Sequence, residues 1–365
     1  MLAFLILFAA TLLAATLIPL SNSRHWSVRA FDFPRFQIAC LSVVWLTLYG
    51  VSELPHSVIL TSSAIAVLGL LVYQCYWILQ YTQLHDVEMQ HLTPDSDKTE
   101  AHIRILSCNV LMSNRNSDAL LALVEKHQPD VLITLESDQW WQDRLDVLDS
   151  YPHRLACPRD NLYGMHVYSR QALKNTAINY LVEDDKPSMN MLVQLNDDTD
   201  VNLYVLHPAP PAPNENSESI ERDVELLQVA KTVAGNASPV IVAGDLNDVA
   251  WSATTRLFRQ ISGLLDPRVG RGLYNTFNAH YWFLRWPLDH VFASPHFRLV
   301  ELQRLPSIGS DHFPLLVELA VTHTKKTPSK IQPGNDEQEL TDPELLERIF
   351  DTQTAKQSAT PARPV

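Results

Sequence analysis

Polar side chains of the kinds that bind metal ions and move protons recur where strands are expected to end. They are Asn109, Glu136, His207, Asp245 with Asn247, Asp289, and Asp311 with His312. Strand ends that meet at one edge of a sheet bring residues distant in sequence together, so these positions could assemble one site. A hard cation such as Mg²⁺ takes one or two carboxylates and keeps waters for a substrate. Glu136 and Asp311 fit that role.

Short motifs surround these residues in a fixed order. They are Leu106-Ser107-Cys108-Asn109-Val110, Pro129-Asp130 followed by Glu136, Gly244-Asp245-Leu246-Asn247, Leu288-Asp289-His290-Val291, and Ser310-Asp311-His312-Phe313-Pro314. Each motif alone is common, but the ordered set over residues 101–320 resembles the endonuclease/exonuclease/phosphatase superfamily with its deoxyribonuclease-I-like fold. The resemblance is to a membrane-anchored member of the bacterial type. It implies the α/β class, as a four-layer α/β/β/α sandwich of two mixed sheets with the site along one rim.

The resemblance also implies a metal centre. Glu136 would be the principal ligand of Mg²⁺ or Mn²⁺, and Asp311 would supply a second carboxylate near the metal. Asn109 would orient the phosphate and the water on the metal. Taken singly, such residues are usually caps or turn residues, but the ordered set favours a functional role.

The remaining motif residues imply proton transfer and phosphate binding. Asp289 and His312 would pair, because a carboxylate fixes the imidazole tautomer and stabilises imidazolium while charge builds on the phosphorus oxygens. Asp245 would activate or align water, and Asn247 would contact a phosphate oxygen. Either Asp245 or the imidazole of His312 could be the general base.

Two further histidines differ in what they imply. His207, in Leu206-His207-Pro208, matches a histidine that deoxyribonuclease-like members place against the scissile phosphate, and it disfavours abasic-site repair. His290 follows Asp289 within an expected strand, so its side chain should point to the opposite face and have a structural role.

An aromatic segment, Tyr274 to Trp286, directly precedes the Asp289 motif and reads YNTFNAHYWFLRW. Tyr281, Trp282, Arg285 and Trp286 make it a candidate substrate loop. Its aromatic residues could stack unpaired bases, enter a lipid interface, or simply pack in the core.

The elements that must position these residues follow from hydrophobic periodicity. Residues 117–127 and 219–233 are expected to be helices. Strands are expected at 103–109, 131–136, 164–169, 191–195, 201–207, 239–244, 288–294 and 315–319. Strands outnumber helices, which agrees with the sandwich that the resemblance implies.

Three long apolar runs occupy residues 1–80, at 2–20, 36–52 and 58–79, and none contains Asp, Glu, Lys or Arg. A spanning helix needs roughly 17 to 25 apolar residues, so we expect three transmembrane helices in a multi-pass protein of the cell membrane. Residues 81–100 are expected to be a linker and residues 321–365 a mostly disordered tail. Arg24, Arg29 and Arg35 place the first loop in the cytoplasm, and three crossings would put the catalytic domain there too.

The net charge of −13 disfavours non-specific binding to duplex DNA. The expected function is therefore a membrane-anchored, metal-dependent phosphoesterase that cleaves phosphodiester or phosphomonoester bonds by water attack. The alternatives are a phospholipid or sphingomyelin-type phosphodiesterase, or a tethered nuclease. An inactive membrane scaffold would lack at least one motif residue, and none is missing. Nothing in the sequence identifies a protein partner.

Overall fold

The computed structural model describes residues 1–52, 57–93, 99–196 and 199–322, and these form two compact units. The first unit contains Met1–Asp86 together with Pro211–Ser219 and Val269–Gly272. The second unit contains the rest of the described chain.

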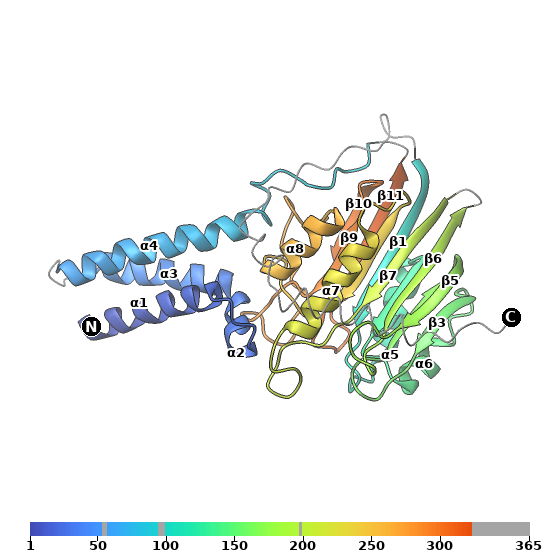
Figure 1. Cartoon of the computed structure of the whole chain (residues 1–365), viewed down its shortest axis with the longest axis horizontal. Coiled ribbons are helices and arrows are strands. Elements are labelled where there is room, and N and C mark those ends of the chain that lie inside the picture. The colour runs from blue at the N-terminus through green and yellow to red at the C-terminus, as the bar shows by residue number, and fades with distance from the viewer. Residues whose placement is uncertain (53–56, 94–98, 197–198, 323–365) are drawn as a thin grey trace. The chain divides into compact units, whose positions relative to one another are not determined.

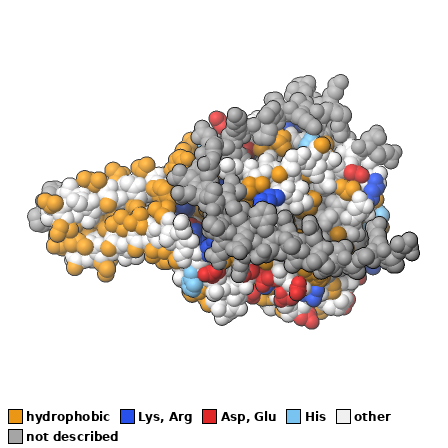
Figure 2. All heavy atoms as spheres, in the orientation of Figure 1, with side chains coloured by type: hydrophobic (Ala, Val, Ile, Leu, Met, Phe, Trp, Pro, Cys, Tyr) orange, Lys and Arg blue, Asp and Glu red, His pale blue; other side chains and the backbone are white. Residues whose placement is uncertain are grey.

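The first unit is helical. Its elements are α1 (Leu2–Leu17), η1 (Ile18–Leu20), α2 (Trp26–Arg29), η2 (Ala30–Asp32), α3 (Arg35–Gly50) and α4 (Val58–Leu79). Leu5, Trp45 and Val67 pack between the helices, and Trp45 Nε1 donates to Leu5 O at 2.8 Å. Hydrophobic side chains also cover the outer surface of these helices, as Figure 2 shows. A helix that is apolar all round is typical of a membrane segment or a buried position.

Two helices in the described residues are long and apolar enough to cross a membrane, namely Leu2–Leu20 with 19 residues and Val58–Leu79 with 22 residues. The first lies near the N-terminus, where a signal sequence has the same properties. The prediction of three transmembrane helices is therefore wrong. The expected span at 36–52 forms α3, whose 16 residues cover about 24 Å, less than the roughly 30 Å of a bilayer core.

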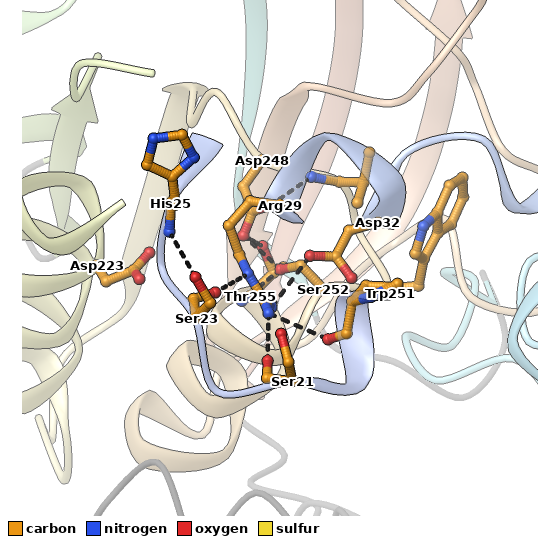
Figure 3. A network of polar contacts seen from close by, with 12 residues as sticks. Ser21, Ser23, His25, Arg29, Asp32, Asp223, Asp248, Trp251, Ser252 and Thr255 are labelled. Carbon is orange, nitrogen blue, oxygen red and sulfur yellow. Dashed lines mark hydrogen bonds and ion pairs between the residues drawn. The ribbon is translucent and has the colours of Figure 1, made fainter. Parts of the chain in front are cut away.

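The turn after η1 is held by Arg29. Its guanidinium donates to the carbonyl oxygens of Pro19, Ser21 and Ser23 and pairs with Asp32 at 3.2 Å (Figure 3). Arg29, one of the three arginines expected to orient the first loop, therefore also has a structural role.

The second unit contains two β-sheets (Figure 1). The six-stranded sheet has the order β10-β11-β1-β2-β4-β3, and the five-stranded sheet has the order β5-β6-β7-β8-β9. Both sheets mix parallel and antiparallel pairs. The strands are β1 (Thr99–Asn109), β2 (Val131–Leu135), β3 (His153–Cys157), β4 (Met165–Ser169), β5 (Ala172–Asn179), β6 (Ser188–Asn196), β7 (Thr199–Leu206), β8 (Val240–Asp245), β9 (Asp289–Ala293), β10 (Phe297–Arg304) and β11 (Leu315–Thr322).

Side chains along each strand point alternately to the two faces of its sheet, so each sheet packs against the other sheet on one face and against helices on the opposite face. In β1, Ile103 and Ile105 face the core between the sheets, whereas Leu106 and Cys108 face helices α5 (Ser117–His127) and α6 (Gln139–Leu145). On the other sheet, Val240 and Val242 of β8 pack against α7 (Ile220–Val233) and α8 (Ala253–Ser262). The result is the expected order of helices, sheet, sheet and helices (Figure 1).

Part of the expected linker is packed into this unit. Met89 is buried in the core between the sheets, and the Glu88 carboxylate pairs with Arg259 at 2.6 Å. Leu92 N donates to Leu299 O at 2.9 Å. Sequence periodicity gave no sign of this packing because the partners lie far along the chain. Of the expected tail, residues 321 and 322 continue β11, and residues 323–365 lie outside the described part of the chain.

Candidate active site

Sheet topology brings the predicted site residues to one rim. Strand β1 pairs in parallel with β2, so Asn109 and Glu136 follow adjacent strand ends. In the other sheet β7 and β8 are parallel, and β9 runs antiparallel to β8 with Asp245 directly opposite Asp289. The carboxyl ends of parallel strands lie at the same edge, which explains why residues from distant motifs meet.

Strands β7 and β8 can approach closely at this rim because the residue before Asp245 is Gly244. Gly244 has φ +141°, and a Cβ built on it would lie 2.0 Å from Leu206 O. Only glycine tolerates both the backbone conformation and this approach of β7 to β8. The Gly-Asp motif thus has a steric basis.

Asp289 and His312 form the expected carboxylate–imidazole pair. His312 Nδ1 donates to Asp289 Oδ2 at 2.7 Å, and both side chains are buried. The other ring nitrogen, Nε2, lies 3.5 Å from Asp245 Oδ2. Burial alone would lower the pKa of His312, but the carboxylates of Asp289 and Asp245 raise it to about 10. The ring is therefore an imidazolium at neutral pH.

Three residues position this pair, and the sequence reading assigned a role to none of them. Ser310 Oγ accepts from His312 N at 3.0 Å and donates to Asn109 O at 2.8 Å. Asp289 N donates to Thr276 Oγ1 at 3.1 Å, and the Phe277 ring lies 4.9 Å from the His312 ring. Ser310 stood inside a quoted motif, whereas Thr276 and Phe277 could have been noticed only as part of the aromatic segment.

Glu136 sits at the rim in a conformation that is uncommon for residues other than glycine, with φ +57°. Asn109 Nδ2 donates to Glu136 Oε1 at 2.8 Å and to Asp245 Oδ2 at 3.2 Å. Glu136 Oε2 is buried and has no hydrogen-bond partner in the described part of the chain. Burial, together with the charges of Asp311 and Asp245, raises the pKa of Glu136 to about 7, against the lowering effects of Asn109 and His312.

These features fit a cation beside Glu136. An unpartnered, buried carboxylate oxygen among other acids is costly unless a positive charge compensates it. Asp311, which is half-buried, is close enough to influence both Glu136 and His312 electrostatically. The donor set of carboxylate and amide oxygens is the one that hard divalent metals take.

A second arrangement also places metal-ligand atoms together. One ligand atom each from Asp245, Asp289 and His312 lies within 4.8 Å of the others, so this group could hold a metal ion. A metal ligand must be a neutral imidazole, whereas His312 is charged and already bonded to Asp289. The group therefore suits proton handling better, and Glu136 suits the metal better.

His207 and Asn247 complete the rim. His207 is buried with Nε2 3.9 Å from Asp245 Oδ2 and its ring 5.3 Å from that of Tyr163. Burial lowers its pKa to about 4, so it is neutral at neutral pH. Asn247 N donates to Asp245 Oδ1 at 2.9 Å, and its side-chain amide donates to Pro208 O at 3.0 Å. All eight predicted site residues outside the aromatic segment thus belong to one rim.

Behind the rim lies a buried polar network that the sequence reading missed. Arg268 pairs with Asp266 at 2.9 Å, donates to His290 Nδ1 at 2.6 Å and reaches Asp289 O at 3.3 Å. His290 Nε2 in turn donates to Asp248 O at 2.9 Å. His290 therefore has the structural role expected of it.

The Asp248 carboxylate anchors the same loop. It accepts hydrogen bonds from Ser252 and Thr255 at the start of α8 (Figure 3). Arg222 donates to Asn247 O at 2.9 Å from α7. The loop that carries Asp245 and Asn247 is thus fixed from two helices.

The aromatic segment is split by the structure into a base and a tip. At the base, Trp286 stacks on Phe277 at 6.2 Å between ring centroids, and Arg285 lies over the Phe313 ring at 4.9 Å. At the tip, Tyr281 and Trp282 are exposed. Of the four candidate loop residues these two are exposed, whereas Arg285 and Trp286 are half-buried.

Comparisons with known proteins agree with this fold. The model of the Endonuclease/Exonuclease/phosphatase family matches residues 106–312. The catalytic domain of human Nocturnin, solved with a bound sulfate anion, is 16% identical with a TM-score of 0.50, covering 62% of this chain and 98% of that one. TDP2 of D. rerio in complex with a single strand DNA product is 16% identical with a TM-score of 0.50, covering 60% and 99%.

A functionally unknown conserved protein from Enterococcus faecalis V583 is 15% identical with a TM-score of 0.50, covering 60% of this chain and 100% of that one. At these identities the likeness shows the fold alone. No curated protein matched the chain. The family model spans all eight predicted site residues outside the aromatic segment, from Asn109 to His312. The chain belongs to the endonuclease/exonuclease/phosphatase family, whose members are hydrolases acting on phosphoester bonds.

Proposed function

We propose that the protein is a membrane-anchored hydrolase that uses Mg²⁺ or Mn²⁺ to cleave phosphodiester or phosphomonoester bonds by water attack. The observation that carries the proposal is the buried, unpartnered Oε2 of Glu136 beside the Asp289–His312 pair. The Glu136 carboxylate can bind a cation, and the Asp289–His312 pair supplies a fixed proton donor. Hydrolysis of an anionic ester uses both a cation and a proton donor.

His312 acts as the proton donor and charge stabiliser. Its Nε2–H is directed toward Asp245 and the rim, where it can bond a phosphoryl oxygen as negative charge develops. Asp289 holds the ring and its charge from the other side. Because His312 is protonated at neutral pH, it does not serve as the general base for the first proton transfer.

Asp245 is the better candidate for the general base. It lies between the imidazole rings of His207 and His312, and burial, with the charge of Asp289 adding to it, raises its pKa against the lowering effect of His312. A raised pKa makes a carboxylate a stronger proton acceptor near neutral pH. Asn109 bonds both Asp245 and Glu136, so it couples the base to the metal side of the rim.

Glu136, with Asp311 and Asn109 nearby, would hold the metal. When bound, Mg²⁺ or Mn²⁺ supplies a Lewis acid that offsets the charge of the phosphoryl oxygens.

Membrane anchoring is supported by the length and composition of Leu2–Leu20 and Val58–Leu79. Within the first unit, Trp26 N donates to Ser217 O and Ser219 N donates to Arg24 O, each at 2.9 Å, so the first loop and the segment 211–219 lie on the same side of the membrane. If Arg24, Arg29 and Arg35 are cytoplasmic, the catalytic domain, which continues from that segment, is cytoplasmic too. Protection of the domain from protease added to sealed, right-side-out vesicles is the expected result, and digestion would contradict it.

The activity is tested on the full chain purified in mild detergent. Bis-p-nitrophenyl phosphate and p-nitrophenyl phosphate, with Mg²⁺ or Mn²⁺ and with chelator, distinguish diester from monoester hydrolysis and reveal metal dependence. His312→Ala should reduce the rate by roughly 100-fold or more. A folded wild type that is inactive on both esters with either metal, or equally active with chelator, would contradict the proposal.

A further inference from the structure

The tip of the aromatic segment exposes four consecutive apolar side chains. Tyr281 is 53% exposed, Trp282 80%, Phe283 53% and Leu284 36%. Trp282 and Tyr281 both pack edge-on against Phe283, at 5.7 and 6.3 Å between ring centroids. The tip therefore presents a clustered apolar surface to its surroundings rather than isolated side chains. Such clusters on a protein surface mark interaction sites.

The base of the same segment is part of the catalytic rim. Phe277 pairs with Trp286 across the base and also with His312, and its ring packs on the His312 ring. Ala279 N donates to Asp311 O at 2.6 Å. The base of the segment thus ties the tip to the two motif residues Asp311 and His312, so a molecule bound at the tip is held near them.

Two guanidinium groups share the ring of Phe313, the residue that directly follows His312. Arg285 and Arg304 lie 4.9 and 4.4 Å from the centroid of the Phe313 ring. Their hydrogen bonds go to backbone carbonyl oxygens, from Arg285 to residues 278 and 279 and from Arg304 to residue 275. Neither has a carboxylate partner within the residues that the structure describes.

Without a carboxylate partner among the described residues, the two guanidinium groups keep N–H donors for another anion. A guanidinium has five N–H donors, and the carbonyl bonds use only some of them. Both cations lie over the same Phe313 ring, so like charges are held close together, and burial and then the charge of Arg285 lower the pKa of Arg304. An anion between them would relieve their mutual repulsion, and a phosphate group matches guanidinium geometry.

We infer that the Tyr281–Leu284 tip enters the interface of a phospholipid bilayer and that Arg285 and Arg304 hold the phosphate of a lipid headgroup beside the catalytic rim. The inference rests on the proposed phosphoesterase function and deepens it, because the substrate becomes a lipid phosphoester. Tyr and Trp favour the bilayer interface, and arginine pairs with headgroup phosphate.

A bilayer explains the tip better than single-stranded nucleic acid does. Base stacking needs ring faces along a basic groove, whereas here the aromatic residues pack edge-on against one another and are followed by the aliphatic Leu284. The chain is also acidic, with a net charge of −13. Its own apolar helices Leu2–Leu20 and Val58–Leu79 have the length to hold it at a membrane.

The first experiment is photocrosslinking with the full chain in nanodiscs of phosphatidylcholine and phosphatidylglycerol. The photoreactive residue p-benzoylphenylalanine replaces Trp282 or, as a matched control, Val147, which is 64% exposed elsewhere on the same unit. The probe at 282 should crosslink to lipid acyl chains and the probe at 147 should not. Crosslinking at 282 to an added single-stranded oligonucleotide instead of lipid, or to neither, would overturn the inference.

The second experiment compares two substrates in the same nanodiscs, the nanodisc phospholipid and bis-p-nitrophenyl phosphate. For Trp282→Ser combined with Phe283→Ser, the ratio of lipid to soluble-ester hydrolysis should fall about 30-fold, because burial of two aromatic side chains is lost. Val147→Ser should leave the ratio at the wild-type value. An unchanged ratio in the double variant would overturn the inference.

The two proposals fail in distinguishable ways. If the wild type hydrolyses bis-p-nitrophenyl phosphate but the probe at position 282 does not reach lipid, the phosphoesterase function stands and the lipid inference fails. If the probe reaches lipid but no ester is hydrolysed, the phosphoesterase function fails. Arg285→Gln with Arg304→Gln should lower the ratio of lipid to soluble-ester hydrolysis about tenfold, through loss of headgroup contact.

Discussion

Replacement of Asp289 by asparagine tests how the His312 imidazolium is held. The 2.7 Å bond joins two buried side chains of opposite charge. Unit charges about 4 Å apart interact by about 4 kcal/mol at an effective dielectric constant of 20. Since about 1.4 kcal/mol corresponds to a factor of ten in rate, Asp289→Asn should lower kcat roughly 1000-fold. Asparagine can also turn its amide toward the ring and favour the wrong tautomer.

The assay is hydrolysis of bis-p-nitrophenyl phosphate by the full chain at saturating Mg²⁺. Asp289→Asn, His312→Ala and the double variant form a mutant cycle. Because Asp289 acts through His312, its replacement should cost little further activity once His312 is alanine. A decrease of less than threefold for Asp289→Asn, or fully additive effects in the double variant, would refute the reasoning.

Two further predictions concern stability. Gly244→Ala should lower the free energy of unfolding by about 3 kcal/mol, because the new Cβ meets Leu206 O at 2.0 Å. The control variant Gly235→Ala has open space around the new Cβ and should lower it by about 1 kcal/mol. Equal losses for the two variants in denaturant titrations would count against the steric account. His166 is buried, and burial lowers its pKa to about 4 from 6.5, so its contribution to stability is complete above pH 6.5 and is lost as the pH falls toward 4. His166→Leu should abolish about 3 kcal/mol of that acid sensitivity, and parallel pH–stability curves for variant and wild type would exclude it.

The catalytic rim was the most predictable part of the molecule. Asn109, Asp245 and Asp289 stand at strand ends that motif and periodicity together identify. Parallel pairing of β1 with β2 and of β7 with β8, and antiparallel pairing of β9 with β8, bring those ends to one edge. What surrounds the rim was less predictable. Thr276 and Phe277 act through the tertiary approach of the aromatic segment to His312, which no local pattern encodes.

Edge strands and short helices escaped prediction for physical reasons. Strand β5 (Ala172–Asn179) lies at a sheet edge with an irregular exposure pattern and a register shift, so it lacks a clean period of two. The first turn of helix α8 (Ala253–Ser262) contains the β-branched pair Thr254 and Thr255, which favours strands. Its start is fixed instead by Ser252, whose side chain accepts from Thr255 N.

Hydrophobicity overestimated the number of helices long enough to cross a membrane because composition does not determine where a helix ends. The run at 36–52 is apolar, yet Pro34 and Gly50 bound a helix of only 16 residues. The segment around Glu88 and Met89 shows the opposite error. It is polar and has no period, yet Met89 is buried in the core between the sheets and Glu88 pairs with Arg259, which lies 171 residues away.

The most direct test of a metal-dependent hydrolase built around Glu136 is the metal dependence of its activity. The rate of bis-p-nitrophenyl phosphate hydrolysis is measured against Mn²⁺ concentration for the full chain, for Glu136→Gln, and for Glu125→Gln, which alters an exposed glutamate on α5. Loss of groups that merely orient metal ligands costs roughly 10- to 100-fold in affinity, so Glu136→Gln should raise the half-saturating Mn²⁺ concentration by at least about 100-fold, while Glu125→Gln follows the wild type. Identical Mn²⁺ curves for Glu136→Gln and wild type would contradict the account.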